Sequence, residues 1–152
     1  MTVEGMYHEE SIEISATAEE VYDAVSDLSR MGEWSPENRG GDWLDGGSGA
    51  VGDRFEGHNQ IGERTWSVVA EVTRAERGSE FQFVTGDPAA PYVRWSYRMS
   101  GSNPTTLTEV WDVEQLPPTL VDADADRLTA RAAAVRDGMA TTLAGIRSTI
   151  ES

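Results

Sequence analysis

Arg64 and Glu109 are the two charged residues that side-chain alternation places on an otherwise apolar face of a predicted sheet. Burying an ion costs several kcal/mol unless it is paired, so these side chains would need each other, water, or hydrogen bonds from Tyr97 and Asn59. A buried glutamate has a raised pKa and can move protons, and an arginine can stabilise a developing negative charge on oxygen. A structural ion pair, or an arginine at a strand end that reaches solvent, would explain the same pattern without chemistry.

The sheet itself is predicted from short segments with period-two alternation that are separated by turn residues. These segments span residues 51–61, 64–73, 79–86, 92–101 and 105–115. Gly62 and Glu63 suit a type II′ hairpin turn, which would pair Asn59 with Trp66. The resulting face consists of Phe55, Gly57, Asn59, Ile61, Arg64, Trp66, Val68, Ala70, Phe81, Phe83, Val93, Trp95, Tyr97, Met99, Leu107, Glu109, Trp111 and Val113.

The amino-terminal segment predicts one more strand and a helix. Residues 8–15 alternate as a half-buried strand does. Thr17 then offers an N-cap oxygen, and Glu20 stands three positions later, as a capping box requires. Apolar residues at helical spacing continue to Leu28, which predicts a helix of about three turns. Residues 30–55 show neither periodicity, and we expect a long irregular loop there.

The carboxyl-terminal segment predicts one long helix over residues 122–150, after a Leu-Pro-Pro sequence that ends the last strand. Its apolar residues recur at intervals of four and three and form a single stripe. The apolar sheet face is the only surface large enough to cover this stripe, so the helix should lie along the concave side of a curved antiparallel sheet. The stripe consists of Leu128, Ala132, Val135, Met139, Leu143, Ile146 and Ile150.

The composition excludes several functions and sets the domain count. A chain of 152 residues is long enough for one well-filled core, so residues 1–152 are read as one domain. The net charge of −15 disfavours nucleic acid and anionic membranes. There is no cysteine, no lysine, no metal-ligand spacing and no apolar run of membrane-span length. We expect a cytoplasmic protein, a monomer or homodimer, without a metal or cofactor.

The order of these elements resembles the helix-grip fold of the START-like superfamily, also called SRPBCC. The local sequence is similar to its polyketide cyclase/dehydrase branch in "ISATAEEVYDAVSDLSRMGEWSPE", "GAVGDRF" and "TTLTEVWDV". The resemblance covers nearly the whole chain. It implies an α+β fold in which a curved antiparallel sheet of about six to seven strands wraps around the long carboxyl-terminal helix, with two short helices after the first strand.

The resemblance also implies a small hydrophobic or amphipathic ligand, lipid-like or polycyclic, enclosed between sheet and helix. Tryptophans near such a cavity would turn apolar rings toward the ligand while their indole N–H groups find polar partners. Alternatively, Trp34 plugs the core beneath the short helices. The candidate ligand-binding residues are Trp34, Trp43, Phe55, Asn59, Trp66, Phe83, Trp95, Tyr97, Trp111, Val135 and Met139.

Two functions are weighed at this point, and a third, a client-chaperone regulator of the kind that some members of the resembled family are, also stays open. The first is a carrier or sensor that holds its ligand without bond chemistry, which the lack of a compact catalytic constellation favours. The second is an aromatase/cyclase or dehydratase without metal or cofactor, with Arg64, Glu109 and Tyr97 as candidate catalytic residues. In the resembled cyclases such pocket groups orient a poly-ketone chain, so Arg64 would stabilise an enolate oxygen and Glu109 would move protons.

Overall fold

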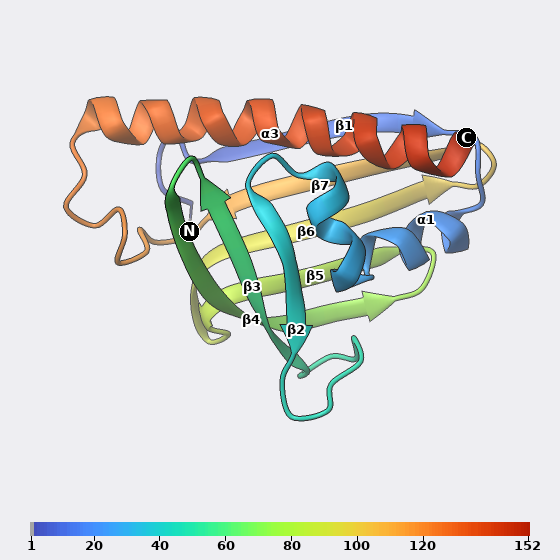
Figure 1. Cartoon of the computed structure of the whole chain (residues 1–152), viewed down its shortest axis with the longest axis horizontal. Helices are drawn as coiled ribbons and strands as arrows, with labels where there is room; N and C mark the ends of the chain where they lie inside the picture. Colours follow the sequence, from blue (N-terminus) through green and yellow to red (C-terminus); the bar gives the residue numbers. More distant parts are fainter. Residues whose placement is uncertain (1) are drawn as a thin grey trace.

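The computed structural model describes residues 2–152. Seven antiparallel strands form one strongly curved sheet, and the long helix α3 runs along its open side (Figure 1). The spatial order of the strands is β1-β7-β6-β5-β4-β3-β2. The elements are β1 (Tyr7–Ile14), α1 (Ala18–Val25), the 3-10 turn η1 (Leu28–Arg30), α2 (Met31–Trp34), β2 (Asn38–Trp43), β3 (Arg54–Ile61), β4 (Arg64–Glu76), β5 (Glu80–Asp87), β6 (Ala90–Gly101), β7 (Thr105–Val113) and α3 (Ala125–Glu151).

The predicted fold class is confirmed: an α+β helix-grip arrangement with two short helices after the first strand. The predicted pairing of the first hairpin is also confirmed, because Asn59 lies opposite Trp66. In the neighbouring strands β6 and β7, Tyr97 lies opposite Glu109. Gly62 has a positive φ of 61° and Glu63 does not, as a type II′ turn requires. The side chains assigned to one face therefore do share the concave face of the sheet.

The first helix begins as predicted and ends earlier. The Thr17 hydroxyl accepts a hydrogen bond from the Glu20 amide, and the Glu20 carboxylate accepts one from the Thr17 amide, which completes the capping box. The helix α1 ends at Val25, after about two turns, rather than continuing to Leu28. Asp27 then caps the short turn η1 through the Ser29 amide, so Leu28 becomes buried from a separate element.

The prediction of an irregular loop over residues 30–55 is wrong in its first half. That segment holds α2 and the strand β2, which pairs with β3 at the edge of the sheet. A register shift between Asn38 and Gly41 interrupts the alternation on which the prediction depended. A glycine is needed at the bulge, because a Cβ on Gly41 would lie 2.9 Å from the Glu56 carbonyl oxygen. The second half, residues 44–53, is irregular as predicted.

The helix α3 packs its apolar stripe toward the sheet, as predicted. It begins at Ala125, three residues later than predicted, because the Asp124 carboxylate accepts a hydrogen bond from the Arg127 amide and acts as the N-cap. The buried residues of the stripe are Ala132, Val135, Met139, Leu143 and Ile146, with Leu128 and Ile150 half-buried. Within residues 2–152, no helix has the length and apolarity that crossing a membrane requires.

Candidate ligand-binding cavity

Two adjoining cavities lie between the concave face of the sheet and α3. The larger has a volume of about 730 Å³ and the smaller about 460 Å³. Their walls share Glu37, Trp95, Glu109, Ala134 and Thr142, so the two form neighbouring lobes of one space. The larger volume lies within the range of small-molecule binding sites.

Most of the predicted ligand-binding residues line this space. Val135 and Met139, from α3, line the smaller lobe. The larger lobe is lined by Trp34, Phe55, Asn59, Trp66, Phe83, Trp95, Tyr97 and Trp111. Because these residues come from α2, β3, β4, β5, β6 and β7, the curvature of the sheet is what brings them together.

Trp43 is the exception, because it lines neither lobe. It lies on the edge strand β2 directly opposite Phe55, and the two rings meet edge-to-face with centroids 5.4 Å apart. Phe55 in turn packs edge-to-face on Phe83, with a centroid distance of 5.1 Å. Trp43 therefore supports a wall residue without facing the cavity, which corrects its assignment as a ligand contact.

Trp34 serves both the core and the cavity. Its side chain is 6% exposed, and its indole N–H donates a 3.0 Å hydrogen bond to the Thr149 hydroxyl of α3. Gly145 of α3 makes room for the ring, because a Cβ there would lie 3.1 Å from the indole. Both alternatives considered for Trp34 therefore apply. It fills the core beneath α1, and it also contributes to the cavity wall.

Glu109 is a buried carboxyl group in the wall of the cavity. It is 4% exposed and lies on β7 between Glu10 of β1 and Tyr97 of β6. The Tyr97 hydroxyl donates a 3.1 Å hydrogen bond to Glu109 Oε2. Glu109 Oε1 is the one buried side-chain oxygen or nitrogen within residues 2–152 that has no hydrogen-bond partner. An unsatisfied buried carboxyl oxygen is costly and calls for an explanation.

The charge state of Glu109 follows from this environment. Burial raises the pKa of Glu109 from 4.5 to about 8; the Tyr97 hydrogen bond opposes this rise and the Glu10 charge adds to it. Burial, followed by the Glu109 charge, raises the pKa of Tyr97 well above 10.0. At neutral pH the pair therefore consists mainly of a protonated carboxyl group and a neutral phenol.

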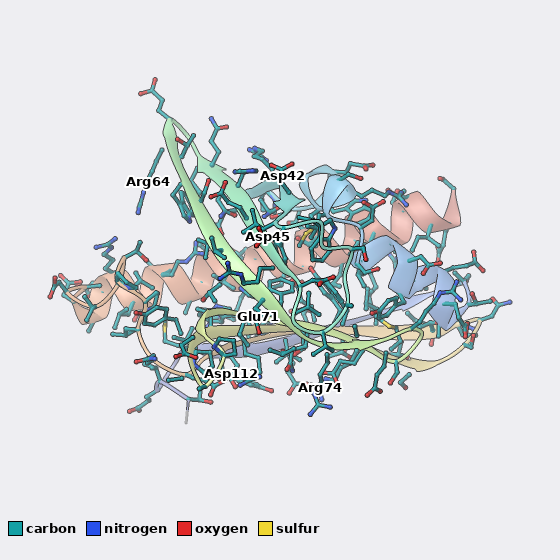
Figure 2. The ribbon with its side chains drawn as sticks, turned by 90° about the horizontal axis from the view of Figure 1, so that it is seen from below. Asp42, Asp45, Arg64, Glu71, Arg74 and Asp112 are labelled. Atoms are coloured by element: carbon teal, nitrogen blue, oxygen red, sulfur yellow. The ribbon has the colours of Figure 1, made fainter. Side chains whose placement is uncertain are left out.

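Of the alternatives considered for Arg64, the structure shows an arginine at a strand end that reaches solvent, and not a buried polar pair with Glu109. Arg64 has the predicted register, opposite Ile61, but its side chain is exposed at the tip of the β3–β4 hairpin (Figure 2). Its guanidinium lies over the Trp66 ring, 5.1 Å from the ring centroid. The β3–β4 hairpin extends past the body of the sheet. A side chain at its tip can therefore be on the inward face of the strand and still lie at the exposed edge of the cavity. Tyr97 supplies the hydrogen bond to Glu109 instead.

The opening of the cavity was not predicted from the sequence. Exposed residues of the hairpin tip and of the first half of α3 line the larger lobe, which therefore reaches the surface between them; they include Ile61, Arg64, Arg127, Ala130 and Ala134. Arg131 of α3 forms a bidentate ion pair with Glu37, and the Nη2–Oε2 distance is 3.0 Å. Neither Arg131 nor Glu37 belongs to an apolar pattern, so the periodicity of the sequence did not predict their ion pair.

Neither histidine lines either lobe. His58 faces the convex side, where it hydrogen-bonds Asp42 at 2.8 Å and Ser67 at 3.0 Å. His8 contacts Glu10 at 2.7 Å. Across residues 2–152, no group of three or more histidine, aspartate or glutamate side chains is arranged to hold a metal ion.

Comparisons with known proteins agree with this fold. The chain belongs to the family described as "Polyketide cyclase / dehydrase and lipid transport", whose model matches residues 8–151. The resemblance predicted from the sequence is thereby confirmed. No curated protein matches the sequence.

Solved structures support the same assignment. The Polyketide_cyc-like protein Cgl2372 from Corynebacterium glutamicum is 33% identical, with a TM-score of 0.68 over 95% of this chain and 91% of that chain. A START superfamily protein from Mycobacterium smegmatis is 16% identical, with a TM-score of 0.70 and coverage of 95% and 99%. The di-domain ARO/CYC protein BexL from the BE-7585A biosynthetic pathway is 15% identical, with a TM-score of 0.69 over 95% of this chain and 46% of that one. The last two likenesses concern the fold alone.

Proposed function

We propose that this protein binds a small hydrophobic or amphipathic ligand, lipid-like or polycyclic, between its sheet and α3. The observation that carries the proposal is the cavity of about 730 Å³ with largely apolar and aromatic walls and one buried polar pair, Glu109 and Tyr97. A site of this kind gains affinity from apolar burial and orientation from a few polar groups. The family description, which includes lipid transport, supports the proposal.

The proposed ligand contacts are the wall residues of the two lobes. Six aromatic side chains would cover the apolar part of the ligand, and α3 would close over it with Val135 and Met139. Asn59 would meet a polar atom near the hairpin, although its amide oxygen already accepts a 3.4 Å hydrogen bond from Asn38. The aromatic contacts are Trp34, Phe55, Trp66, Phe83, Trp95 and Trp111.

Binding of Nile red, an uncharged apolar dye, tests the proposal. Ala134 is exposed on α3 and lines both lobes, whereas the neighbouring Ala133 is exposed and lines neither. We expect Nile red fluorescence to rise and its emission to shift to the blue with the unaltered protein. Ala134→Trp should weaken that binding at least tenfold, about 1.4 kcal/mol, because the indole enters the opening. Ala133→Trp should leave it unchanged.

Two results would count against cavity binding. One is the absence of saturable Nile red binding by the folded protein. The other is an equal effect of the Ala134→Trp and Ala133→Trp variants, which would place the dye on the helix surface.

A second function, a cyclase or dehydratase without metal or cofactor, is favoured by one observation, the hydrogen-bonded Glu109–Tyr97 pair. A protonated carboxyl group can donate its proton to a departing hydroxyl group, which then leaves as water. The carboxylate so formed can accept the proton that the carbon next to the carbonyl loses as the double bond forms. The protonated group can also polarise a ligand carbonyl. Arg64 is exposed and therefore would act only on a ligand group near the opening. The enzyme would lose turnover in Glu109→Gln while still binding its substrate.

Mass spectrometry of a 3-hydroxy ketone that bears a naphthyl ring tests this second function, because dehydration removes one water. Dehydration by the unaltered protein and none by Glu109→Gln would support catalysis. Equal rates with both proteins, or no reaction despite demonstrated binding, would leave the carrier function alone.

A further inference from the structure

We propose that the ligand presents an uncharged carbonyl oxygen to the Glu109–Tyr97 pair, which gives it one hydrogen bond and discriminates against anionic head groups. The inference rests on the proposed function, because it requires that the cavity hold a ligand. It adds the chemistry of the ligand's polar end and the place in the cavity where that end lies.

The Glu109–Tyr97 pair carries one O–H donor more than its internal hydrogen bond uses. While Glu109 is protonated, the two side chains carry two O–H groups and make one hydrogen bond to each other, over 3.1 Å. One O–H group is therefore left without an acceptor. When Glu109 is ionised, the Tyr97 hydroxyl is the sole O–H group and the carboxylate consumes it. The pair thus has one spare donor in the first state and none in the second, whichever oxygen carries the proton.

The surroundings offer this spare donor no partner. Glu109 Oε1 is buried and has no hydrogen-bond partner. The Thr142 hydroxyl, on the facing helix α3, already donates a 2.8 Å hydrogen bond to the Gly138 carbonyl oxygen. Glu109 lines both lobes together with Trp95 and Thr142, so the spare donor lies where the lobes meet. A ligand in this space is the acceptor that the structure lacks. A small turn of the carboxyl group or of the phenol hydroxyl brings the O–H group to it.

An anion fits this position poorly. A carboxylate ligand would bring a negative charge into an apolar space beside the protonated Glu109 and near Glu10, inside a protein of net charge −15. It would have to take up a proton to bind, which is costly at neutral pH for an acid of ordinary pKa. A ketone oxygen accepts the hydrogen bond and brings no charge.

The proposal predicts that carbonyl recognition weakens as Glu109 ionises. Burial raises the pKa of Glu109 to about 8, so the spare donor is present at neutral pH and is lost in alkaline solution. Other ionisable groups could imitate this effect and need controls. Those facing Glu109 or the two lobes are Glu10 and His8 on β1, Glu37 between α2 and β2, Arg39 on β2, Arg64 on β4, Tyr92 and Tyr97 on β6, and Arg127, Arg131 and Asp137 on α3.

Competition with Nile red tests the proposal with three probes of similar size. These are 2-acetylnaphthalene, which has a carbonyl acceptor, 2-isopropylnaphthalene, which has none, and 2-naphthoate, which is an anion. The quantity compared is the ratio of the affinity for the ketone to the affinity for the hydrocarbon. From about pH 6.5 to about pH 9.5 this ratio should fall roughly tenfold, since one hydrogen bond is worth about that much. At the lower pH, 2-naphthoate should bind at least ten times more weakly than the ketone.

Two variants assign the effect to Glu109. Glu109→Gln keeps an N–H donor that does not titrate, so the ratio should lose its pH dependence. Glu10→Gln removes the neighbouring negative charge, so the fall in the ratio should remain and move to lower pH, because Glu10 raises the pKa of Glu109. Circular dichroism at each pH confirms that the proteins compared are folded.

The outcomes separate this inference from the proposed function. If Nile red and all three naphthalenes fail to bind, the proposed function is wrong. If they bind but the ratio does not change with pH, or 2-naphthoate equals the ketone, the cavity holds ligands and the carbonyl inference is wrong. A fall in the ratio that persists in Glu109→Gln would also overturn it, because another group would then be titrating.

Discussion

Replacing Glu109 with glutamine should flatten part of the pH dependence of folding stability. The folded state raises the pKa of this carboxyl group from 4.5 to about 8. Between those values the folded protein holds a proton that the unfolded chain has released, so stability falls as pH rises. The contribution of the protonated group is fully present below about pH 4.5 and is lost as pH rises through about 8. The amide side chain of the Glu109→Gln variant has no such proton.

The magnitude follows from the same change in proton affinity. Each tenfold change in proton affinity corresponds to about 1.4 kcal/mol, so the full change sets an upper limit of roughly 5 kcal/mol. Water entry and side-chain relaxation around an ionised Glu109 reduce this, and we expect about 2 to 4 kcal/mol.

Urea denaturation provides the assay, with the free energy of unfolding measured at about pH 5 and about pH 9. The loss between the two pH values should be about 2 to 4 kcal/mol larger in the unaltered protein than in Glu109→Gln. Glu13→Gln, at an exposed position of β1, should behave like the unaltered protein. Parallel pH profiles for the unaltered protein and Glu109→Gln would refute the reasoning, because Glu109 would then titrate alike in the folded and unfolded states.

Three further predictions concern the core, the cavity wall and charge. Leu143→Ala should cost about 2 to 5 kcal/mol in urea denaturation, because Leu143 is 1% exposed, whereas half-buried Leu128→Ala should cost clearly less. Trp34→Phe and Thr149→Val should each lose about 1 kcal/mol or more, and their double variant less than the sum, since both remove one hydrogen bond. Duplex DNA should show no binding by fluorescence anisotropy at physiological salt; a salt-dependent micromolar affinity would contradict the charge argument.

The concave face of the sheet could be predicted from the sequence because alternation has a period of two and the turns are short. The type II′ turn at Gly62 sets the register of β3 and β4. Alternation places Tyr97 and Glu109 on the same face, and the structure adds that they lie opposite each other. The partner of α3 followed from its apolar stripe, which needs a surface of matching size. Local patterns in the sequence therefore specify this face and the packing of α3 against it.

The edge strand β2 could not be predicted by the same means. Its pairing with β3 shifts at a bulge between Asn38 and Gly41, which moves successive side chains off a regular alternation. Its glycines have no side chain, so they do not indicate which side of the strand faces the core. Such a strand is specified by the neighbour with which it pairs, and a single-sequence pattern contains no direct sign of that neighbour.

The candidate site also combines residues whose positions could be predicted from the sequence with residues whose positions could not. Side-chain alternation placed Glu109 and Tyr97 on the same face of the sheet. The buried position considered for Arg64 was wrong, because alternation indicates which face a side chain is on and not how deeply it is buried. A residue at the tip of a hairpin that extends beyond the sheet can face inward and still be exposed. The Arg131–Glu37 pair depends on where α3 crosses the sheet, which periodicity leaves undetermined.

Chemical shifts of isotope-labelled methyl groups, recorded while 2-acetylnaphthalene is added, test most directly whether the cavity is the binding site. Val68, Val93 and Ile146 line the larger lobe, while Val84 and Leu107 are buried elsewhere and line neither lobe. We predict saturable shifts for the first three methyl-bearing residues and little change for the last two. Shifts confined to exposed residues such as Val51 and Val121, or no saturable shifts at all, would contradict binding between the sheet and α3.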